Sequence, residues 1–161
     1  MEQLAQCRID SPAGPLLLAA SPGGLVALEF EHRSRRQAGL HSPQALAPYV
    51  RELEEYFAGT RRQFTFPIDL RGTDFQLACW RALLEIPYGE TRSYADIARA
   101  IGKPHAFRAV GMANNRNPIA IVVPCHRVIA SDGTLCGYGG GLDVKRKLLE
   151  LEGALTGILA A

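Results

Sequence analysis

A cysteine followed directly by a histidine is the pair in this sequence best suited to chemistry. Cys125 and His126 lie in the segment Pro124–Val128, just after an apolar run. A thiol attacks as the thiolate, and an ordinary pKa of about 8.5 leaves only a few per cent ionised at neutral pH. His126, as a base, or Arg127, as a cationic neighbour, would raise that fraction. Adjacency does not establish contact, so the dipeptide fits either a catalytic thiol or a small buried side chain.

The other cysteines do not suggest a disulfide or metal framework. The four cysteines stand at positions 7, 79, 125 and 136, and no pair has the CxxC spacing of a zinc or redox site. A chain of 161 residues with an ordinary core needs no disulfide. We expect reduced thiols, so the question becomes which thiol is reactive.

The composition is that of a globular protein of one or two small domains. Hydrophobic residues make up 47% and charged residues 21%, which excludes disordered and fibrous classes. No apolar run approaches the roughly 18–20 residues that span a bilayer. The start, MEQLAQCRID, lacks the pattern of a secretory signal. We therefore expect a cytoplasmic protein with no membrane partner.

The charge distribution favours a phosphate-binding segment. The net charge is only +2, but residues 103–127 carry no acidic residue and four basic ones: Lys103, Arg108, Arg116 and Arg127. Such a stretch suits a nucleic-acid partner. A solvated basic face explains it equally well.

Before position 72 the pattern indicates a small α+β unit. Leu16–Ala19 and Leu25–Phe30 are predicted strands separated by a turn cluster. Ser42 is predicted to cap a helix that ends at Gly59, and Phe64–Leu70 is a predicted strand. Nothing in this unit suggests chemistry, so residues 1–71 are interpreted as a scaffold domain.

From position 72 the pattern indicates helices that could bind DNA. Thr73–Gln76 and Ser93–Asp96 have the capping-box pattern, and each opens a helix. The second helix ends at Gly102, and a third is predicted over roughly 105–114. Two short helices joined by about three residues form a helix-turn-helix.

The predicted third helix is thin. Small residues occupy much of it, with Arg108 as its main long polar side chain; the small residues are Ala106, Ala109, Gly111 and Ala113. A thin helix could enter a narrow groove of DNA or pack closely on a neighbouring helix, and the sequence leaves both open.

The reactive pair follows an apolar run. Ile119–Val123 is predicted to be a buried strand, which would place Cys125 at a fixed edge after Pro124. Asp143 is predicted to cap a last helix before Gly153.

Pro124–Val128 resembles the active-site signature of the O6-alkylguanine-DNA alkyltransferases, also called methylated-DNA–protein-cysteine methyltransferases. Further segments resemble the family pattern in the same order: Ile86–Glu90, Ser93–Tyr94, Arg108–Gly111, Asn117–Pro118, Gly137–Gly141 and Lys145–Gly153. The similarity is dense over 72–153 and weaker before that, where Ile9–Pro12 and Tyr56–Gly59 are recognisable. The resemblance implies an α+β fold: a small N-terminal sheet-plus-helix, ribonuclease H-like domain (1–71) and a C-terminal winged-helix-like helix-turn-helix domain (72–161).

The resemblance also implies catalytic roles. Cys125 would accept the alkyl group, with His126 as a base acting through water and Glu152 orienting its far ring nitrogen. Asn117 would hold the backbone around the active-site strand. Tyr94 would donate its hydroxyl proton toward the guanine ring.

The same resemblance implies a pocket for the damaged base. The carbonyls of Cys125 and Val128 would accept from the exocyclic amine of guanine. A loop of Tyr138, Gly139 and Gly140 would wall the pocket and place a backbone donor near O6.

The implied partner is double-stranded DNA, bound through its minor groove. Arg108 would fill the space of a flipped nucleotide, beside Ala109 and Gly111 on the thin helix. Arg116, Arg92 and Lys103 are candidates for phosphate contacts. We expect a monomer in solution, with clustering on DNA left open.

Three features qualify the resemblance. Cys7 lacks the partner residues of a structural zinc site, so we expect no metal, and the reaction implies no cofactor. Phe107 is bulkier than the residue expected beside Arg108, and it either points into the core or alters groove contact. Cys136 is either a bystander or a residue that approaches the pocket.

The implied reaction is an irreversible, single-turnover transfer of the alkyl group of O6-alkylguanine to Cys125, with O4-alkylthymine an open second substrate. One alternative is a lesion-binding sensor without transfer activity, against which the intact Cys125 argues. Another is a Cys-His hydrolase, which would need an oxyanion hole and would leave the arginine-bearing thin helix unexplained.

Overall fold

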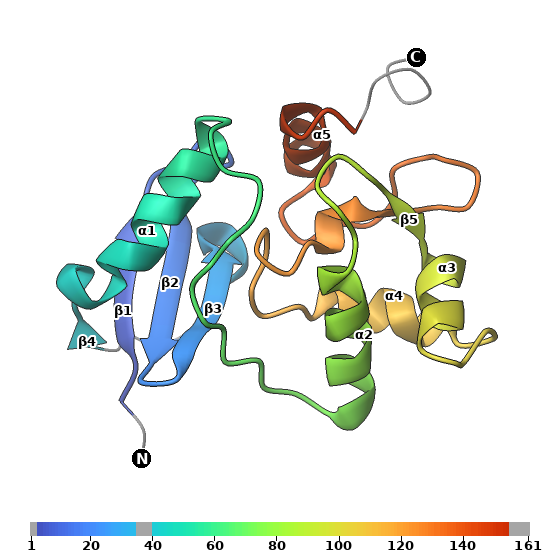
Figure 1. The fold of residues 1–161 in the computed structure, drawn as a ribbon, viewed down its shortest axis with the longest axis horizontal. Coiled ribbons are helices and arrows are strands. Elements are labelled where there is room, and N and C mark those ends of the chain that lie inside the picture. The colour runs from blue at the N-terminus through green and yellow to red at the C-terminus, as the bar shows by residue number, and fades with distance from the viewer. Residues whose placement is uncertain (1–2, 35–39, 155–161) are drawn as a thin grey trace. The chain divides into compact units, whose positions relative to one another are not determined.

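The computed structural model of the chain describes residues 3–34 and 40–154, and these form two compact units (Figure 1). The first unit covers the chain up to Arg71 together with Pro118–Ala120. The second covers Gly72–Asn117 and the chain from Ile121 onward.

The first unit is a four-stranded sheet with one long helix. The sheet has the order β3-β2-β1-β4, in which β2 pairs antiparallel with β1 and β3, while β4 pairs parallel with β1. Its elements are β1 (Ala5–Ile9), β2 (Leu16–Ser21), β3 (Gly24–Phe30), the short 3₁₀ helix η1 (Glu31–Arg33), β4 (Leu40–His41) and α1 (Pro43–Phe57). The predicted strands at β2 and β3 are confirmed.

Helix α1 covers the sheet with an apolar face. Leu46, Leu53 and Tyr56 are completely buried, and this spacing places them along one side of the helix. As predicted, Ser42 is the N-cap and a proline follows at the first helical position. Gly59 lies just past the helix end with φ +79°, a left-handed conformation that glycine adopts at little cost.

The predicted strand over Phe64–Leu70 is wrong. Only Ile68 forms a bridge, with Leu25, although the Leu25 N–H also donates to the Pro67 carbonyl (3.0 Å) and the Asp69 N–H to the Leu25 carbonyl (2.8 Å). Pro67 has no N–H to donate, so a regular ladder does not extend through this segment. The approach requires Gly24, because a Cβ there would lie 2.6 Å from the Pro67 carbonyl oxygen.

The second unit contains four helices: α2 (Asp74–Leu84), α3 (Tyr94–Ala100), α4 (Phe107–Asn115) and α5 (Leu142–Leu151). Both predicted capping boxes are confirmed. Thr73 and Ser93 each accept from the backbone N–H three residues on, and the side chain at that third position accepts in return from the capping residue's backbone N–H. Trp80 of α2 is buried, and its indole N–H donates to the carbonyl of Ala113 in α4 at 2.9 Å.

Helices α3 and α4 form the predicted helix-turn-helix, but with a longer connection. Six residues, 101–106, separate them, where about three were predicted. Gly102 ends α3 in the left-handed conformation (φ +75°), and Ala106 then serves as the N-cap of α4. Helix α4 therefore begins at Phe107, two residues later than predicted.

The segment before the reactive cysteine is buried but is not the predicted strand. Ile119 forms one bridge with Leu28, and the chain then turns at Ile121, whose φ is +72°. A positive φ is strained for a β-branched residue, and it breaks the extended conformation that a strand needs. The chain continues into a 3₁₀ turn, η2 (Cys125–Arg127), and then into β6 (Val128–Ile129), which pairs parallel with β5 (Arg92–Ser93).

The last helix is not capped by Asp143 as predicted. Gly141 is the N-cap, with φ +97°, and Asp143 lies in the first turn of α5, where its charge favours the positive end of the helix. The N-cap residue has a positive φ, which glycine adopts readily, and the helix therefore starts at Leu142, two residues earlier than an Asp143 cap would place it.

The fold-class prediction is confirmed: the protein is mixed α+β, with an N-terminal sheet-plus-helix unit and a C-terminal helical unit. Within the described ranges, no helix combines the length and apolar character needed to cross a membrane.

Candidate active site

Cys125 begins the η2 turn, immediately after Pro124, and only 5% of its surface is exposed. The side-chain amide of Asn117 donates to its sulfur at 3.0 Å and to the carbonyl of Val123 at 2.8 Å. Burial raises the pKa of the Cys125 thiol, and the Asn117 hydrogen bond and the charge of Lys145 oppose that rise. Asn117 therefore contacts both the backbone before the cysteine and its sulfur, where the resemblance implied only the first contact.

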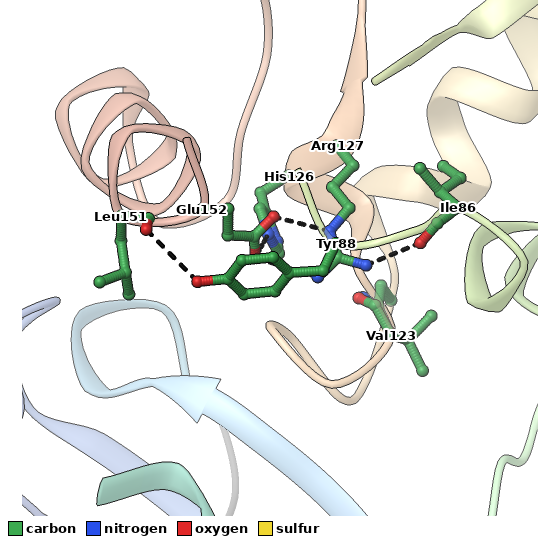
Figure 2. Close-up of polar contacts among 8 residues, drawn as sticks. Ile86, Tyr88, Val123, His126, Arg127, Leu151 and Glu152 are labelled. Atoms are coloured by element: carbon green, nitrogen blue, oxygen red, sulfur yellow. Dashed lines mark hydrogen bonds and ion pairs between the residues drawn. The ribbon is translucent and has the colours of Figure 1, made fainter. Parts of the chain in front are cut away.

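His126 is paired with Glu152. Its Nε2 lies 2.8 Å from a carboxylate oxygen of Glu152, and neither side chain is exposed (Figure 2). Burial alone would raise the pKa of Glu152, but contacts with His126 and Arg127 lower it to about 2. Glu152 is thus ionised and acts as an acceptor, which assigns the proton of a neutral His126 to Nε2.

The other ring nitrogen of His126 is left as an acceptor. Among the described residues, Nδ1 has no hydrogen-bond partner, although it is buried. Burial also lowers the pKa of His126, which keeps the imidazole neutral. The described contacts include no direct hydrogen bond between His126 and Cys125, so a proton moving from sulfur to Nδ1 requires a bridging molecule such as water.

Arg127 holds the carboxylate of Glu152 in place (Figure 2). Its Nε donates to one carboxylate oxygen at 2.7 Å and its Nη2 to the other at 3.1 Å, while Nη1 donates to the Ile86 carbonyl at 2.7 Å. The guanidinium also lies over the ring of Tyr88, 5.7 Å from its centroid, and the Tyr88 hydroxyl donates to the Leu151 carbonyl at 3.3 Å. Sequence reasoning considered Arg127 only as a cationic neighbour of the thiol, whereas its contacts are to Glu152.

Tyr94 is the first residue of α3. Its hydroxyl donates to the carbonyl of Cys136 at 3.2 Å, and the sulfur of Cys136 lies 4.0 Å from the same oxygen. Burial raises the pKa of Tyr94, and interactions with Cys136 add to that rise. The hydroxyl therefore keeps its proton over the whole physiological range. Of the two expectations for Cys136, the structure supports a position near this hydroxyl.

Two of the predicted pocket residues, Val128 and Tyr138, interact with Cys125. The side chain of Tyr138 interacts with the sulfur of Cys125, and Gly139 and Gly140 follow it in a partly buried loop. The carbonyl of Val128 accepts from Lys145 at 2.6 Å. The Cys125 carbonyl likewise accepts from Asn114, at 3.3 Å. Each carbonyl that was predicted to bind the guanine amine thus already accepts from a donor of the protein, and the Cys125 carbonyl accepts from the Val128 N–H as well.

Sequence reasoning missed Lys145 and Asn114. Lys145 is completely buried, and it shares one face of α5 with Leu148 and Leu149. A lysine at the apolar positions of an amphipathic helix was the available signal. No comparable pattern marks Asn114, which is buried in α4 beside Ala113.

Most of the residues predicted to bind DNA lie on α4 or at its end, whereas Tyr94 begins α3, Arg92 lies in β5 and Lys103 lies between α3 and α4. Arg108, Ala109 and Arg116 are exposed, and Gly111 is half-buried beside the ring of Tyr94. The expectation that Phe107 points into the core is wrong, because it is 47% exposed at the start of α4.

An open apolar hollow lies against the same helix. It has a volume of about 240 Å³, and it is lined by Thr73, Phe75, Gln76, Ala109, Met112, Ala113 and Arg116. Met112 is 60% exposed at this hollow.

The site residues form two groups, one around the Cys125 sulfur and one along the exposed face of α4.

The sequence matches the models of two domains of one family. Residues 74–154 match the DNA binding domain of 6-O-methylguanine DNA methyltransferase, and residues 7–70 match its ribonuclease-like domain. The chain belongs to this family. The resemblance inferred from the sequence is therefore confirmed.

Relatives align over nearly their whole length. The chain is 52% identical over 148 residues to a methylated-DNA–protein-cysteine methyltransferase of Methanosarcina barkeri, covering 89% of this chain and 94% of the relative. It is 54% identical over 147 residues to the protein of that name from Mycobacterium tuberculosis, covering 89% of each. The crystal structure of Mycobacterium tuberculosis OGT in complex with DNA matches with a TM-score of 0.89 at 53% identity, covering 93% of each chain.

Proposed function

We propose that this protein repairs DNA by transferring the alkyl group of an O6-alkylated guanine to its own Cys125. The proposal rests on the hydrogen-bond partners around the Cys125 sulfur and His126. The sulfur accepts a hydrogen bond from Asn117, and the adjacent His126 presents a buried acceptor nitrogen while Glu152 holds the opposite one. The names of the relatives, and the DNA bound by the similar crystallised protein, support the same reaction.

In the proposed reaction, the Cys125 thiol passes its proton through a bridging water to Nδ1 of His126. The thiolate then attacks the alkyl carbon, so that an S–C bond forms and the C–O6 bond breaks. The electron pair of the broken bond remains on the guanine, which Tyr94 stabilises by donating a hydrogen bond. The proton returns from His126 to the released base, and the thioether remains on the protein because nothing in the chemistry cleaves it.

The exposed face of α4 would hold the DNA. O6 lies inside the duplex, so the damaged nucleotide must be flipped out at a cost of a few kcal/mol. Arg108 is exposed on this helix, which lets it take the space that the nucleotide leaves. The small exposed Ala109 and the neighbouring Gly111 allow the helix to approach the minor groove closely.

Two other functions fit less well. A lesion sensor without transfer activity gives no role to a cysteine whose sulfur is hydrogen-bonded by Asn117 beside a His–Glu pair. A hydrolase would not need the exposed Arg108 on α4, a helix that is rich in small residues.

The test is the intact mass of the protein after mixing with a duplex that contains one O6-methylguanine. We expect a gain of roughly 14 Da, because S-methylation replaces a hydrogen with a methyl group. Cys125→Ser should show no gain, and Cys136→Ser should gain the same mass as wild type. Binding to the lesion with unchanged mass would establish the sensor instead. A duplex with O4-methylthymine, run in parallel, measures the second substrate.

A further inference from the structure

The amine of Lys145 is enclosed by protein. The residue lies in the middle of α5 with none of its surface exposed. Its ammonium donates to three backbone carbonyls: Val128 at 2.6 Å, Cys136 at 3.0 Å and Gly137 at 3.4 Å. Carbonyls satisfy its hydrogen bonds but carry no net charge, and a buried charge is unfavourable unless an opposite charge offsets it.

The neighbouring carboxylate does not supply that charge. Glu152 is paired with Arg127, which binds both of its oxygens. His126 contributes no charge, because burial lowers its pKa. Among the described residues, no carboxylate forms an ion pair with Lys145. Burial lowers the pKa of Lys145, so its charged form is balanced in this region only when one further anion is present.

The candidates for that anion are the groups that titrate near Lys145. Tyr94 is excluded, because burial raises its pKa and its hydroxyl donates to the Cys136 carbonyl. The two thiols remain, since Lys145 interacts electrostatically with Cys136 and also with Cys125. The two sulfurs differ in their hydrogen bonds. Among the contacts described, only the Cys125 sulfur accepts from a side-chain amide, which belongs to Asn117. That bond favours the thiolate at Cys125.

The hydrogen bonds of Lys145 also join the segments around the thiol. Val128 follows the η2 turn that contains Cys125, and its N–H donates to the Cys125 carbonyl. Cys136 and Gly137 precede Tyr138, whose side chain interacts with the sulfur. One ammonium thus holds together the turn that bears the nucleophile and the loop that walls the pocket.

We propose that Lys145 is a positioning residue of the transfer reaction, whose buried ammonium offsets the charge of the Cys125 thiolate while its hydrogen bonds hold the pocket loop against the nucleophile turn. The role of the thiolate as alkyl acceptor rests on the proposed function. The ionisation of Cys125 does not, so it is measured separately, without DNA.

The first readout is carbamidomethylation of Cys125 by iodoacetamide as a function of pH. Trypsin cleaves after Arg116 and Arg127, so the peptide 117–127 contains Cys125 as its only cysteine and reports it apart from Cys136. The variants are Lys145→Met, which removes the charge at similar length, and Lys145→Gln, which removes the charge but keeps a donor. Lys147→Met is the matched control, because Lys147 is exposed two residues further along α5.

In both neutral variants we expect the rate of carbamidomethylation to rise at a pH at least one unit higher than in wild type, which shifts the rising limb of the pH profile upward. At any pH below the pKa of the thiol, the reaction is then about tenfold slower than in wild type. At high pH their rates should approach that of wild type. Lys145→Arg should restore part of the shift, and Lys147→Met should match wild type. Rates that fall equally at every pH, or an unshifted limb in Lys145→Gln, would overturn the proposal.

The second readout is alkyl transfer from the free base O6-benzylguanine over the same pH range. The limb should shift as it does for carbamidomethylation. If wild type gains no methyl group from the O6-methylguanine duplex either, the proposed function fails while the first readout still decides the role of Lys145. If wild type transfers and Lys145→Gln has an unchanged profile in both assays, the inference about Lys145 alone fails.

Discussion

Nε2 of His126 lies 2.8 Å from a carboxylate oxygen of Glu152, with both side chains completely buried. The carboxylate is ionised, since the contacts of His126 and Arg127 lower its pKa to about 2. This pairing determines which nitrogen of His126 carries the proton, and so which one can accept the proton of Cys125.

Glu152→Gln should therefore impair both transfer and stability. The variant leaves Arg127 buried without its counter-charge, which costs roughly 3–5 kcal/mol in the free energy of unfolding. The amide can also donate to Nε2 and favour the wrong tautomer, so transfer should slow by roughly 100-fold or more. Urea unfolding and the rate of methyl transfer measure the two effects, with the exposed Glu150→Gln as the matched control.

The stability of wild type relative to Glu152→Gln should depend on pH. The folded pKa of Glu152 is about 2, below its ordinary value of 4.5. Its ionised form therefore stabilises the fold fully above about pH 4.5, and this contribution is lost as the pH falls through 2. The difference in free energy of unfolding should be smaller at pH 3 than at pH 6 by roughly 2 kcal/mol. An equal difference at both pH values would contradict the ionised pair.

Asn117→Ala should slow transfer more than it destabilises the protein. It removes the donor to the Cys125 sulfur, for which we expect a rate loss of roughly 100-fold. The rising limb of the pH–rate profile should also move to higher pH. The Val123 carbonyl loses its partner, at about 1–3 kcal/mol. Transfer from O6-benzylguanine and thermal unfolding measure the effects, and Asn115→Ala, which is exposed at the end of α4, serves as control. A lower rate with no shift of the limb would mean that Asn117 acts only on the backbone.

Arg108→Ala should separate base flipping from chemistry. Without the side chain that occupies the vacated space, transfer from duplex DNA should slow by at least about tenfold, because flipping costs a few kcal/mol. Transfer from O6-benzylguanine needs no flipping and should be unchanged. Equal losses on both substrates would show that Arg108 affects the active site instead.

Arg116→Ala should behave differently if Arg116 contacts a phosphate. It should weaken binding to lesion and undamaged duplexes alike and reduce the slope of log affinity against log salt by about 1. Fluorescence anisotropy at several salt concentrations measures that slope. An unchanged slope would leave Arg116 as solvent-exposed charge.

Ser42 and Thr73 are both N-cap residues, but their contributions to the free energy of unfolding should differ. Thr73 caps α2 with a reciprocal capping box, whereas the Ser42 side chain makes no capping hydrogen bond in α1. Thr73→Ala should cost about 1 kcal/mol in the free energy of unfolding, and Ser42→Ala much less. Urea unfolding followed by circular dichroism compares them, and equal losses would contradict the difference in geometry.

The sequence by itself determined the features that depend on neighbouring residues. A capping box joins residues three positions apart, and it was correctly predicted at Thr73 and Ser93 because its bonds form within one turn. The family followed from an ordered set of short motifs around Cys125. The predicted role of Glu152 came from that resemblance, since nothing in the local sequence connects it with His126.

Only the tertiary structure decided the features that depend on burial and on distant partners. Glu152 meets His126 across 26 positions, and that contact assigns the tautomer. Ile121 adopts a positive φ where its residue type predicted a strand, since tertiary contacts override local preference. Lys145, typically a surface residue, became a candidate for the active site because α5 buries it beside two chain segments that the sequence does not connect.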